Sequence, residues 1–334
     1  MSSTSPSSIF PDTPIRPPFD PELAPVAAAL REMILPMTTD TLAPTREAIE
    51  RGVPGVEPTD LTVGGAVKVT EVQAAGPQGA PDVTLMVLSP AAGGTGLAGI
   101  YYIHGGGMVT GNRKFAIESY LPYVAEGKAV VVSVEYRLAP ENPDPAPVED
   151  CYAGLVWTAR HADEFGIDAD RLIIAGPSAG GGLAAGTALL ARDRGFPSLS
   201  HQVLSAPMLD DRLDTHSSRM LDGEAVWDRN DNLFGWTALL GERRGGPDVS
   251  SYAAPARATD LSGLPRTYLD CGSAEGFRDE VLTYARRLSE AGVSVDLHMW
   301  GGAFHTFDVL APHAAIARAS NAARDEFIRR AIEK

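Results

Sequence analysis

The residues best suited to chemistry in this chain surround Ser178. A short apolar strand predicted over residues 171–175 leads into Gly176-Pro177-Ser178-Ala179-Gly180, and a helix rich in small residues is predicted over 179–194. A serine in a Gly-x-Ser-x-Gly turn between a buried strand and a helix sits on a sharp, strained elbow that exposes its hydroxyl. The N-terminus of the helix favours negative charge developing beside it. The pattern therefore predicts that Ser178 is a nucleophile; the alternative is a Gly-rich helix start that binds phosphate.

A second glycine-rich loop, His104-Gly105-Gly106-Gly107, follows a strand predicted over residues 100–103. Such a loop exposes backbone N–H groups and supplies part of the oxyanion hole in lipases and esterases. Glycines allow a tetrahedral oxyanion to approach the backbone without meeting a Cβ. We interpret His104 itself as holding the loop rather than as a base. A phosphate-binding helix start would leave this loop unexplained, so the two motifs together predict acyl-transfer chemistry.

A serine nucleophile needs a general base, and in hydrolases with this elbow the chain order is serine, acid, histidine. His305 is the histidine that follows Ser178 on a loop just beyond a late predicted strand, residues 293–300. His298 falls within that strand, and His313 falls within the predicted closing helix over residues 311–333. We therefore predict that His305 is the base. The remaining histidines are His104, His161, His201 and His216.

The orienting acid is sought between Ser178 and His305. Glu275 lies in the loop between a strand predicted over residues 266–270 and a helix predicted over 279–291, where an orienting carboxylate is needed. Glutamate is an accepted alternative to aspartate in this role. Asp279, together with Glu280, resembles a first-turn helix residue that favours the helix dipole. We predict Glu275, with Asp279 and Asp270 as the alternatives.

The elements that must position these residues alternate between strands and helices. An antiparallel pair is predicted over residues 67–72 and 83–88, followed by apolar strands over 100–103 and 129–134 of the kind buried on both faces. A further helix is predicted over residues 150–161, and a further strand over 202–206. This alternation predicts an α/β fold with a mostly parallel central sheet flanked by helices.

Two stretches fit the alternation less well. Residues 1–52 contain a Pro-rich start, whose first 10–20 residues we expect to be extended or disordered, and two helices expected over about 23–34 and 45–51. Residues 208–262 form a long excursion of the kind that is often a lid. We therefore predict an N-terminal cap region over 1–52 and a catalytic domain over 53–334. Residues 208–235 are predicted to contribute to the cap; the alternative is a surface excursion with its own apolar cluster.

Composition excludes several classes of protein. The 334 residues are 44% hydrophobic and 21% charged, which argues against disorder of the bulk of the chain. A formal net charge of −15 argues against nucleic acids and anionic membranes as partners. Cys151 and Cys271 are the only cysteines, so there is no disulfide framework. The start carries no basic and apolar signal segment, and from this we expect a cytoplasmic protein.

The combined motifs resemble the hormone-sensitive-lipase-like family of α/β-hydrolase esterases, of bacterial carboxylesterase type. The resemblance extends over about residues 60–330. It rests on five segments in the order expected for the family: His104-Gly105-Gly106-Gly107, Tyr136-Arg137-Leu138-Ala139-Pro140-Glu141, Gly176-Pro177-Ser178-Ala179-Gly180-Gly181, Arg278-Asp279-Glu280 and His305-Thr306-Phe307. It implies an α/β-hydrolase fold with a helical cap, oxyanion N–H groups from Gly106, Gly107 and Ala179, no cofactor or metal, and frequent homodimers.

The chain departs from the family pattern at four places. Pro177 stands where an aspartate usually precedes the nucleophile, and Glu275-Gly276-Phe277 replaces Asp-Pro-Leu. Thr306 replaces the common glycine after the histidine, and Pro143-Asp144-Pro145 has an acid where an aromatic is frequent. None of these changes removes a required chemical group.

The sequence therefore predicts a serine carboxylesterase for neutral esters of short to medium acyl chain. The alternatives on the same triad are a lactonase, an amidase or a hydrolase of bulky esters. A non-catalytic small-molecule binder on the same scaffold is a hypothesis from another class, disfavoured because serine, histidine and carboxylate are all present. The candidates for an apolar substrate pocket are Met108, Val109, Met208, Trp227, Phe234, Phe277 and Phe304.

Overall fold

A computed structural model describes residues 14–52 and 58–333. Its centre is an eight-stranded sheet in the order β1-β2-β4-β3-β5-β6-β7-β8. The strands are β1 (Val67–Ala74), β2 (Val83–Pro90), β3 (Leu97–Ile103), β4 (Ala129–Glu135), β5 (Ile167–Pro177), β6 (His201–Ser205), β7 (Arg266–Gly272) and β8 (Val295–Trp300). The pairs β1–β2 and β2–β4 are antiparallel, and every later pair is parallel. The predicted α/β fold with a mostly parallel sheet is confirmed.

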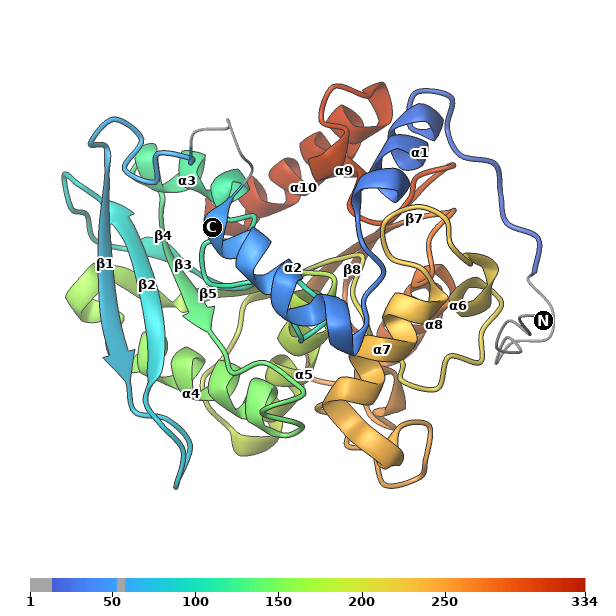
Figure 1. Cartoon of the computed structure of the whole chain (residues 1–334). Helices are drawn as coiled ribbons and strands as arrows, with labels where there is room; N and C mark the ends of the chain where they lie inside the picture. The colour runs from blue at the N-terminus through green and yellow to red at the C-terminus, as the bar shows by residue number, and fades with distance from the viewer. Residues whose placement is uncertain (1–13, 53–57, 334) are drawn as a thin grey trace, which may run out of the picture.

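Helices cover both faces of the sheet (Figure 1). One face packs against α4 (Ala146–Arg160), α5 (Ala179–Arg194) and α8 (Arg278–Glu290). The other packs against η1 (Glu118–Tyr120), α3 (Leu121–Ala125) and α10 (Ala315–Ile332). Because both faces are buried, the central strands are almost continuously apolar, and every residue of β3 is buried.

The segments that we predicted as a cap lie over one end of this core. The helices of these segments are α1 (Ala24–Met33), α2 (Thr39–Arg51), α6 (Ser217–Met220) and α7 (Arg229–Leu240). Leu23 and Ala27 share an apolar cluster with Met220, Leu221 and Phe304. The N-terminal end of α2 lies beside α7 (Figure 1), where the Met37 N–H donates to Asp231 Oδ1 at 2.7 Å.

Arg46 fastens α2 to the body of the molecule. Its guanidinium donates to the carbonyl oxygens of Val109 at 2.7 Å and Ala139 at 2.8 Å. It also forms a two-armed ion pair with Glu141, at 2.8 and 2.9 Å. This arrangement ties the second helix to the loop that follows the glycine-rich segment.

Several predicted element boundaries were wrong. The helix expected from residue 45 begins at Thr39, because Thr38 and Thr41 form a capping box that starts it ahead of Pro44. The closing helix expected over 311–333 begins only at Ala315 (α10), and the short helix α9 (Phe307–Leu310) precedes it, so His313 lies between helices and not inside one. The remaining short helices are η2 (Asp163–Phe165), η3 (Gly241–Arg243) and η4 (Pro255–Arg257). The disorder expected for the N-terminal start falls largely on residues 1–13, outside the described residues.

No helix among the described residues combines the length and the apolar character needed to cross a bilayer.

Candidate active site

Ser178 stands between β5 and α5, as the elbow pattern predicts. Its φ of 57° and ψ of −126° place it in a strained backbone region that a non-glycine residue rarely adopts. A Cβ on Gly176 would lie 2.4 Å from the backbone of Gly180, and one on Gly180 would lie 2.1 Å from the Ile103 carbonyl oxygen. Both glycines are therefore required for β5, α5 and β3 to approach closely enough to form the elbow.

Three side chains form one hydrogen-bonded line at this elbow. Ser178 Oγ lies 2.9 Å from His305 Nε2, and His305 Nδ1 lies 3.2 Å from Glu275 Oε1. The three residues are only 6%, 5% and 1% exposed, respectively. The second oxygen of Glu275 accepts the Gly272 N–H at 2.9 Å, which fixes the carboxylate at the end of β7. The arrangement can move a proton from the serine hydroxyl to an oriented imidazole.

The imidazole of His305 is held by its surroundings as well as by Glu275. The Phe277 ring packs edge-on against it, with 5.0 Å between centroids and an interplanar angle of 90°. Thr306, the next residue, has a φ of 60°, in the left-handed region that favours glycine. The backbone conformation explains why a glycine would suit this position, and the threonine occupies it with its hydroxyl donating to the His305 carbonyl oxygen at 2.7 Å.

The glycine-rich loop passes directly beside Ser178. Gly106 and Gly107 have φ values of 110° and 64°, and a Cβ on Gly106 would lie 2.2 Å from the Thr110 carbonyl oxygen. Among the described residues, no protein acceptor is found for the N–H groups of Gly106, Gly107 or Ala179. These N–H groups are therefore free to bind a developing oxyanion.

His104 has the geometry of a structural residue. Its ring stacks on Tyr136, with centroids 4.2 Å apart, and Nδ1 lies 2.8 Å from the Gly105 carbonyl oxygen. The Tyr136 hydroxyl in turn donates to the His104 carbonyl oxygen at 2.9 Å. Complete burial lowers the pKa of His104 to about 4, so the ring is neutral at neutral pH. Its contacts hold the loop in shape.

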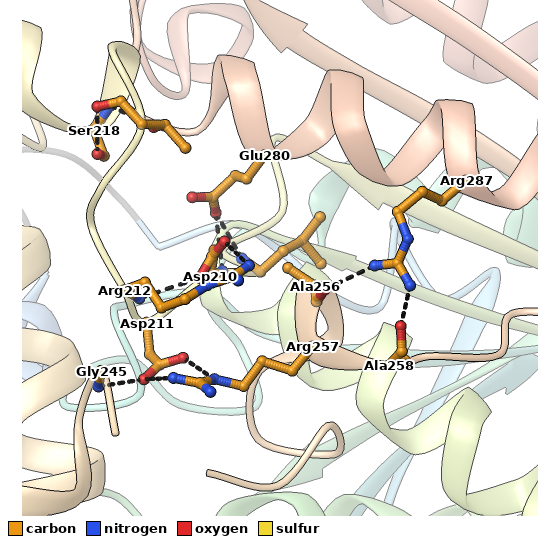
Figure 2. Close-up of polar contacts among 12 residues, drawn as sticks. Asp210, Asp211, Arg212, Ser218, Gly245, Ala256, Arg257, Ala258, Glu280 and Arg287 are labelled. Carbon is orange, nitrogen blue, oxygen red and sulfur yellow. Dashed lines mark hydrogen bonds and ion pairs between the residues drawn. The ribbon is translucent and has the colours of Figure 1, made fainter. Parts of the chain in front are cut away.

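The other carboxylates near the strand end have different partners. Asp279 accepts the Ser217 N–H at 2.8 Å and pairs with Arg278. Glu280 is buried and accepts the backbone N–H groups of Leu209 at 2.7 Å and Asp210 at 3.3 Å (Figure 2). Both side chains thus attach residues 209–217 to α8. They are more than simple first-turn residues placed for the helix dipole.

The long excursion over residues 208–262 is held in place by further polar contacts. Figure 2 shows Asp211 between Arg257 and Gly245, with the Arg257 Nε donating to Asp211 Oδ1 at 2.5 Å and the Gly245 N–H donating to Oδ2 at 2.7 Å. Arg287 on α8 donates to the carbonyl oxygens of Ala256, at 2.8 Å, and Ala258. Asp211 thus ties the two ends of the excursion to each other, and Arg287 attaches its later part to α8.

A cavity of about 210 Å³ opens onto Ser178 and His305. Of the seven residues predicted to line it, only Trp227 does so among the described residues. Met108, Val109, Met208, Phe277 and Phe304 are almost fully buried in apolar clusters, and Phe234 packs against the same core. For these six residues the prediction was wrong, because their side chains pack in the core and do not line the cavity.

The walls that the sequence did not predict come from several parts of the chain: β3 and the segment after it, the excursion, the segment after His305, and α10. They are Tyr102, Phe115, Ala116, Tyr120, Val226, Phe307, Val309 and Leu310, with the polar residues Ser205, Asp270, Asp308 and Arg324. Phe307 and Asp308 follow His305 closely, and that proximity was the one local signal in the sequence. The others meet only through tertiary packing.

Comparisons with known proteins agree with this geometry. A family model described as alpha/beta hydrolase fold matches residues 100–309. Carboxylesterase NlhH of Mycobacterium tuberculosis is 35% identical over 235 residues, covering 68% of this chain and 72% of the relative. An arylesterase of Saccharolobus solfataricus is 34% identical over 214 residues, covering 62% of this chain and 67% of the relative.

Solved structures match nearly the whole chain. A bacterial heroin esterase superposes with a TM-score of 0.85 at 39% identity, covering 94% of this chain and 98% of that one. Esterase LipW from Mycobacterium marinum superposes with a TM-score of 0.82 at 32% identity, covering 95% and 99%.

Proposed function

The chain belongs to the hormone-sensitive-lipase-like family of α/β-hydrolase-fold esterases, and on that premise we propose that it is a serine carboxylesterase acting through Ser178, His305 and Glu275. The observation that carries the proposal is the line of contacts from Ser178 Oγ through the imidazole to Glu275, at 2.9 and 3.2 Å. Its substrates are neutral small-molecule esters.

The geometry supports a two-step reaction. His305 Nε2 takes the proton of Ser178 as the hydroxyl oxygen attacks the ester carbonyl carbon. The N–H groups of Gly106, Gly107 and Ala179 hold the oxyanion of the tetrahedral intermediate. The imidazolium then protonates the departing alcohol, Glu275 stabilises its charge, and water attacks the acyl-enzyme by the same route in reverse.

The size of the cavity favours short to medium acyl chains. Its volume of about 210 Å³ lies below the roughly 300–1,000 Å³ of pockets that hold drug-sized ligands. Val226 and Trp227, from the excursion, form part of its wall, and a Cβ on Gly107 would lie 2.3 Å from the Trp227 ring. The indole thus lies directly over the oxyanion loop.

We further propose that residues 1–52 and 208–235 together form the cap of the site. The contacts of Arg46 with Val109, after the glycine-rich loop, and with Ala139, after β4, support this arrangement, as does the Met37–Asp231 hydrogen bond. Residues 53–334 would then be the catalytic domain.

A cytoplasmic location and a homodimer complete the proposal. β8 is an edge strand of the sheet, and Leu297 and Met299 on it are 39% and 37% exposed. An edge with exposed apolar side chains is a natural place for a second copy to pair. Light scattering on a sizing column would show a mass near twice 35.3 kDa, and a monomer at micromolar concentration would contradict the dimer.

An ester panel tests the proposed function. p-Nitrophenyl esters from acetate to decanoate should be hydrolysed with kcat/KM highest for short or medium chains. Ser178→Ala should abolish turnover of p-nitrophenyl butyrate, whereas turnover retained by this variant would contradict the mechanism. A corresponding panel of lactones and amides separates the esterase from the alternatives on the same triad.

A further inference from the structure

Charged side chains line the catalytic cavity away from the triad. Asp270 at the end of β7, Asp308 on α9 and Arg324 on α10 line the same cavity as Ser178 and His305. Asp308 and Arg324 also line a second, neighbouring cavity of about 320 Å³, whose lining contains no member of the triad. Asp308 and Arg324 therefore stand where the catalytic cavity borders the next one, and Asp270 lines the catalytic cavity alone.

The cation of this group already has partners within the protein. Arg324 Nη1 donates to Asp308 Oδ2 at 2.8 Å and lies 3.4 Å from Ser205 Oγ, and Nη2 donates to Asn321. The side chains of Arg324 and Asp308 are only 11% and 13% exposed. Arg324 thus compensates one carboxylate of the group, and the trio of Asp270, Asp308 and Arg324 carries a formal charge of −1 when both acids are ionised.

Asp270 is the carboxylate that remains incompletely satisfied. It is 4% exposed, and its Oδ2 accepts from the Tyr268 hydroxyl at 3.1 Å, the Ser320 hydroxyl at 3.1 Å and the Trp300 indole N–H at 3.3 Å. No hydrogen-bond donor to Oδ1 is found in the described parts of the chain. Burial raises the pKa of Asp270, while Arg324 opposes that rise. Oδ1 therefore keeps its capacity to accept a hydrogen bond from a ligand or from solvent.

Much of the remaining cavity wall is apolar. Phe115, Val226, Trp227, Phe307 and Leu310 line the same cavity as Ser178 and Asp270. A substrate that fills it would need an aliphatic stem. The group at the end of that stem would meet Asp270, beside a trio of net negative charge.

From this arrangement we propose that Asp270 is a specificity-determining residue, which selects esters carrying a hydrogen-bond donor, a hydroxyl or an ammonium, at the far end of the chain in the cavity. The inference rests on the proposed esterase function and adds a substrate class to it. Esters ending in a carboxylate are disfavoured because Asp270 and Asp308 repel them.

Matched substrates test the proposal on the wild-type enzyme. The acyl side is probed with methyl 6-hydroxyhexanoate against methyl heptanoate, and the alcohol side with 4-hydroxybutyl acetate against pentyl acetate, each pair exchanging a hydroxyl for a methyl. Acid release is titrated at constant pH. We expect kcat/KM to favour the hydroxyl ester roughly 10- to 100-fold in one of the two pairs, as for one hydrogen bond to an ionised carboxylate. The kcat/KM for methyl 6-aminohexanoate, compared with that for methyl heptanoate, then measures the preference for a terminal ammonium group.

The outcomes separate the two proposals. Equal rates, or faster hydrolysis of the methyl-ended ester in both pairs, would overturn the specificity inference and leave the esterase intact. No turnover of any of the four esters would overturn the esterase function and this inference with it.

Asp270→Asn supplies an independent test. The three donors facing Oδ2 would hold the amide oxygen, so the amide NH₂ would face the cavity and replace an acceptor with a donor. The preference for methyl 6-hydroxyhexanoate over methyl 6-oxoheptanoate, whose ketone only accepts, should fall about tenfold or more. Asp325→Asn is the control, because Asp325 lines only the second of the two cavities. An unchanged preference in Asp270→Asn, or an equal fall in the control, would contradict the role of Asp270.

Discussion

Replacing Glu275 with glutamine probes the orienting carboxylate with almost no change in shape. Glu275 is 1% exposed, and its two oxygens have different partners: Oε2 accepts from the Gly272 N–H and Oε1 faces His305 Nδ1. In Glu275→Gln the amide oxygen must stay on the Gly272 N–H, because the reverse orientation would place two donors face to face. The amide NH₂ then faces His305 Nδ1.

This orientation forces the wrong tautomer of the base. An NH₂ group donating to Nδ1 requires Nδ1 to be unprotonated, which moves the imidazole proton to Nε2, toward Ser178. A protonated Nε2 cannot accept the serine proton. The corresponding exchange of carboxylate for amide in a serine protease triad lowers kcat by about 10⁴, and we expect a loss of about 10³–10⁴ here, or roughly 4–5 kcal/mol.

Asp279→Asn is the matched control. Asp279 lies four residues along the chain, but it accepts from Ser217 and Arg278, so its loss should weaken the attachment of the excursion and lower kcat less than tenfold. Stopped-flow hydrolysis of p-nitrophenyl butyrate separates acylation from deacylation, and circular dichroism checks folding. The reasoning fails if Glu275→Gln keeps more than a tenth of the wild-type kcat, or if Asp279→Asn loses as much as Glu275→Gln.

Three further changes test other parts of the site. The pKa of His104 is about 4 in the folded protein against 6.5 for the free side chain, so the native state binds fewer protons than the unfolded state between those values. About 3 kcal/mol of stability, fully present above pH 6.5, is therefore lost as the pH falls to 4. His104→Phe keeps the stacking on Tyr136 and should remove this pH dependence of the free energy of urea unfolding, whereas an unchanged pH dependence would contradict the cause given. Gly106→Ala places a Cβ 2.2 Å from the Thr110 carbonyl oxygen at a φ of 110°, so displacement of the oxyanion loop should lower kcat about 10²–10³-fold, and wild-type turnover would argue against its role. Arg46→Ala removes the contacts that fasten α2, and limited proteolysis should cut the N-terminal region faster while KM rises; identical digestion would argue against docking by this residue.

The fold and the line from Ser178 to Glu275 follow closely from local sequence. The elbow can be recognised in the sequence because Gly176 and Gly180 have no room for a side chain and must be glycine. The order of serine, acid and histidine along the chain then indicates His305 as the base. The central sheet can be predicted equally directly, since strands buried on both faces need continuous runs of apolar residues.

The substrate cavity does not follow from local sequence. Phe304 precedes His305, the proposed base, yet it packs with Phe19 near the N-terminus, with 6.1 Å between ring centroids. Asp270 and Arg324 are 54 positions apart and meet only because α10 folds back over β7. The spacing of residues along one strand or helix cannot predict that two residues from different elements line the same cavity. Similarly, the capping box at Thr38 moved the start of α2 ahead of a proline that otherwise predicts a helix boundary.

Labelling with a fluorophosphonate asks whether Ser178 is the nucleophile, because the reagent reacts with an activated serine and reports its position. Intact mass spectrometry should show one adduct per chain, peptide mapping should place it on Ser178, and both Ser178→Ala and His305→Ala should remain unlabelled. A wild-type protein that stays unlabelled, or a Ser178→Ala variant labelled to the same extent, would contradict the assignment of Ser178 as the nucleophile.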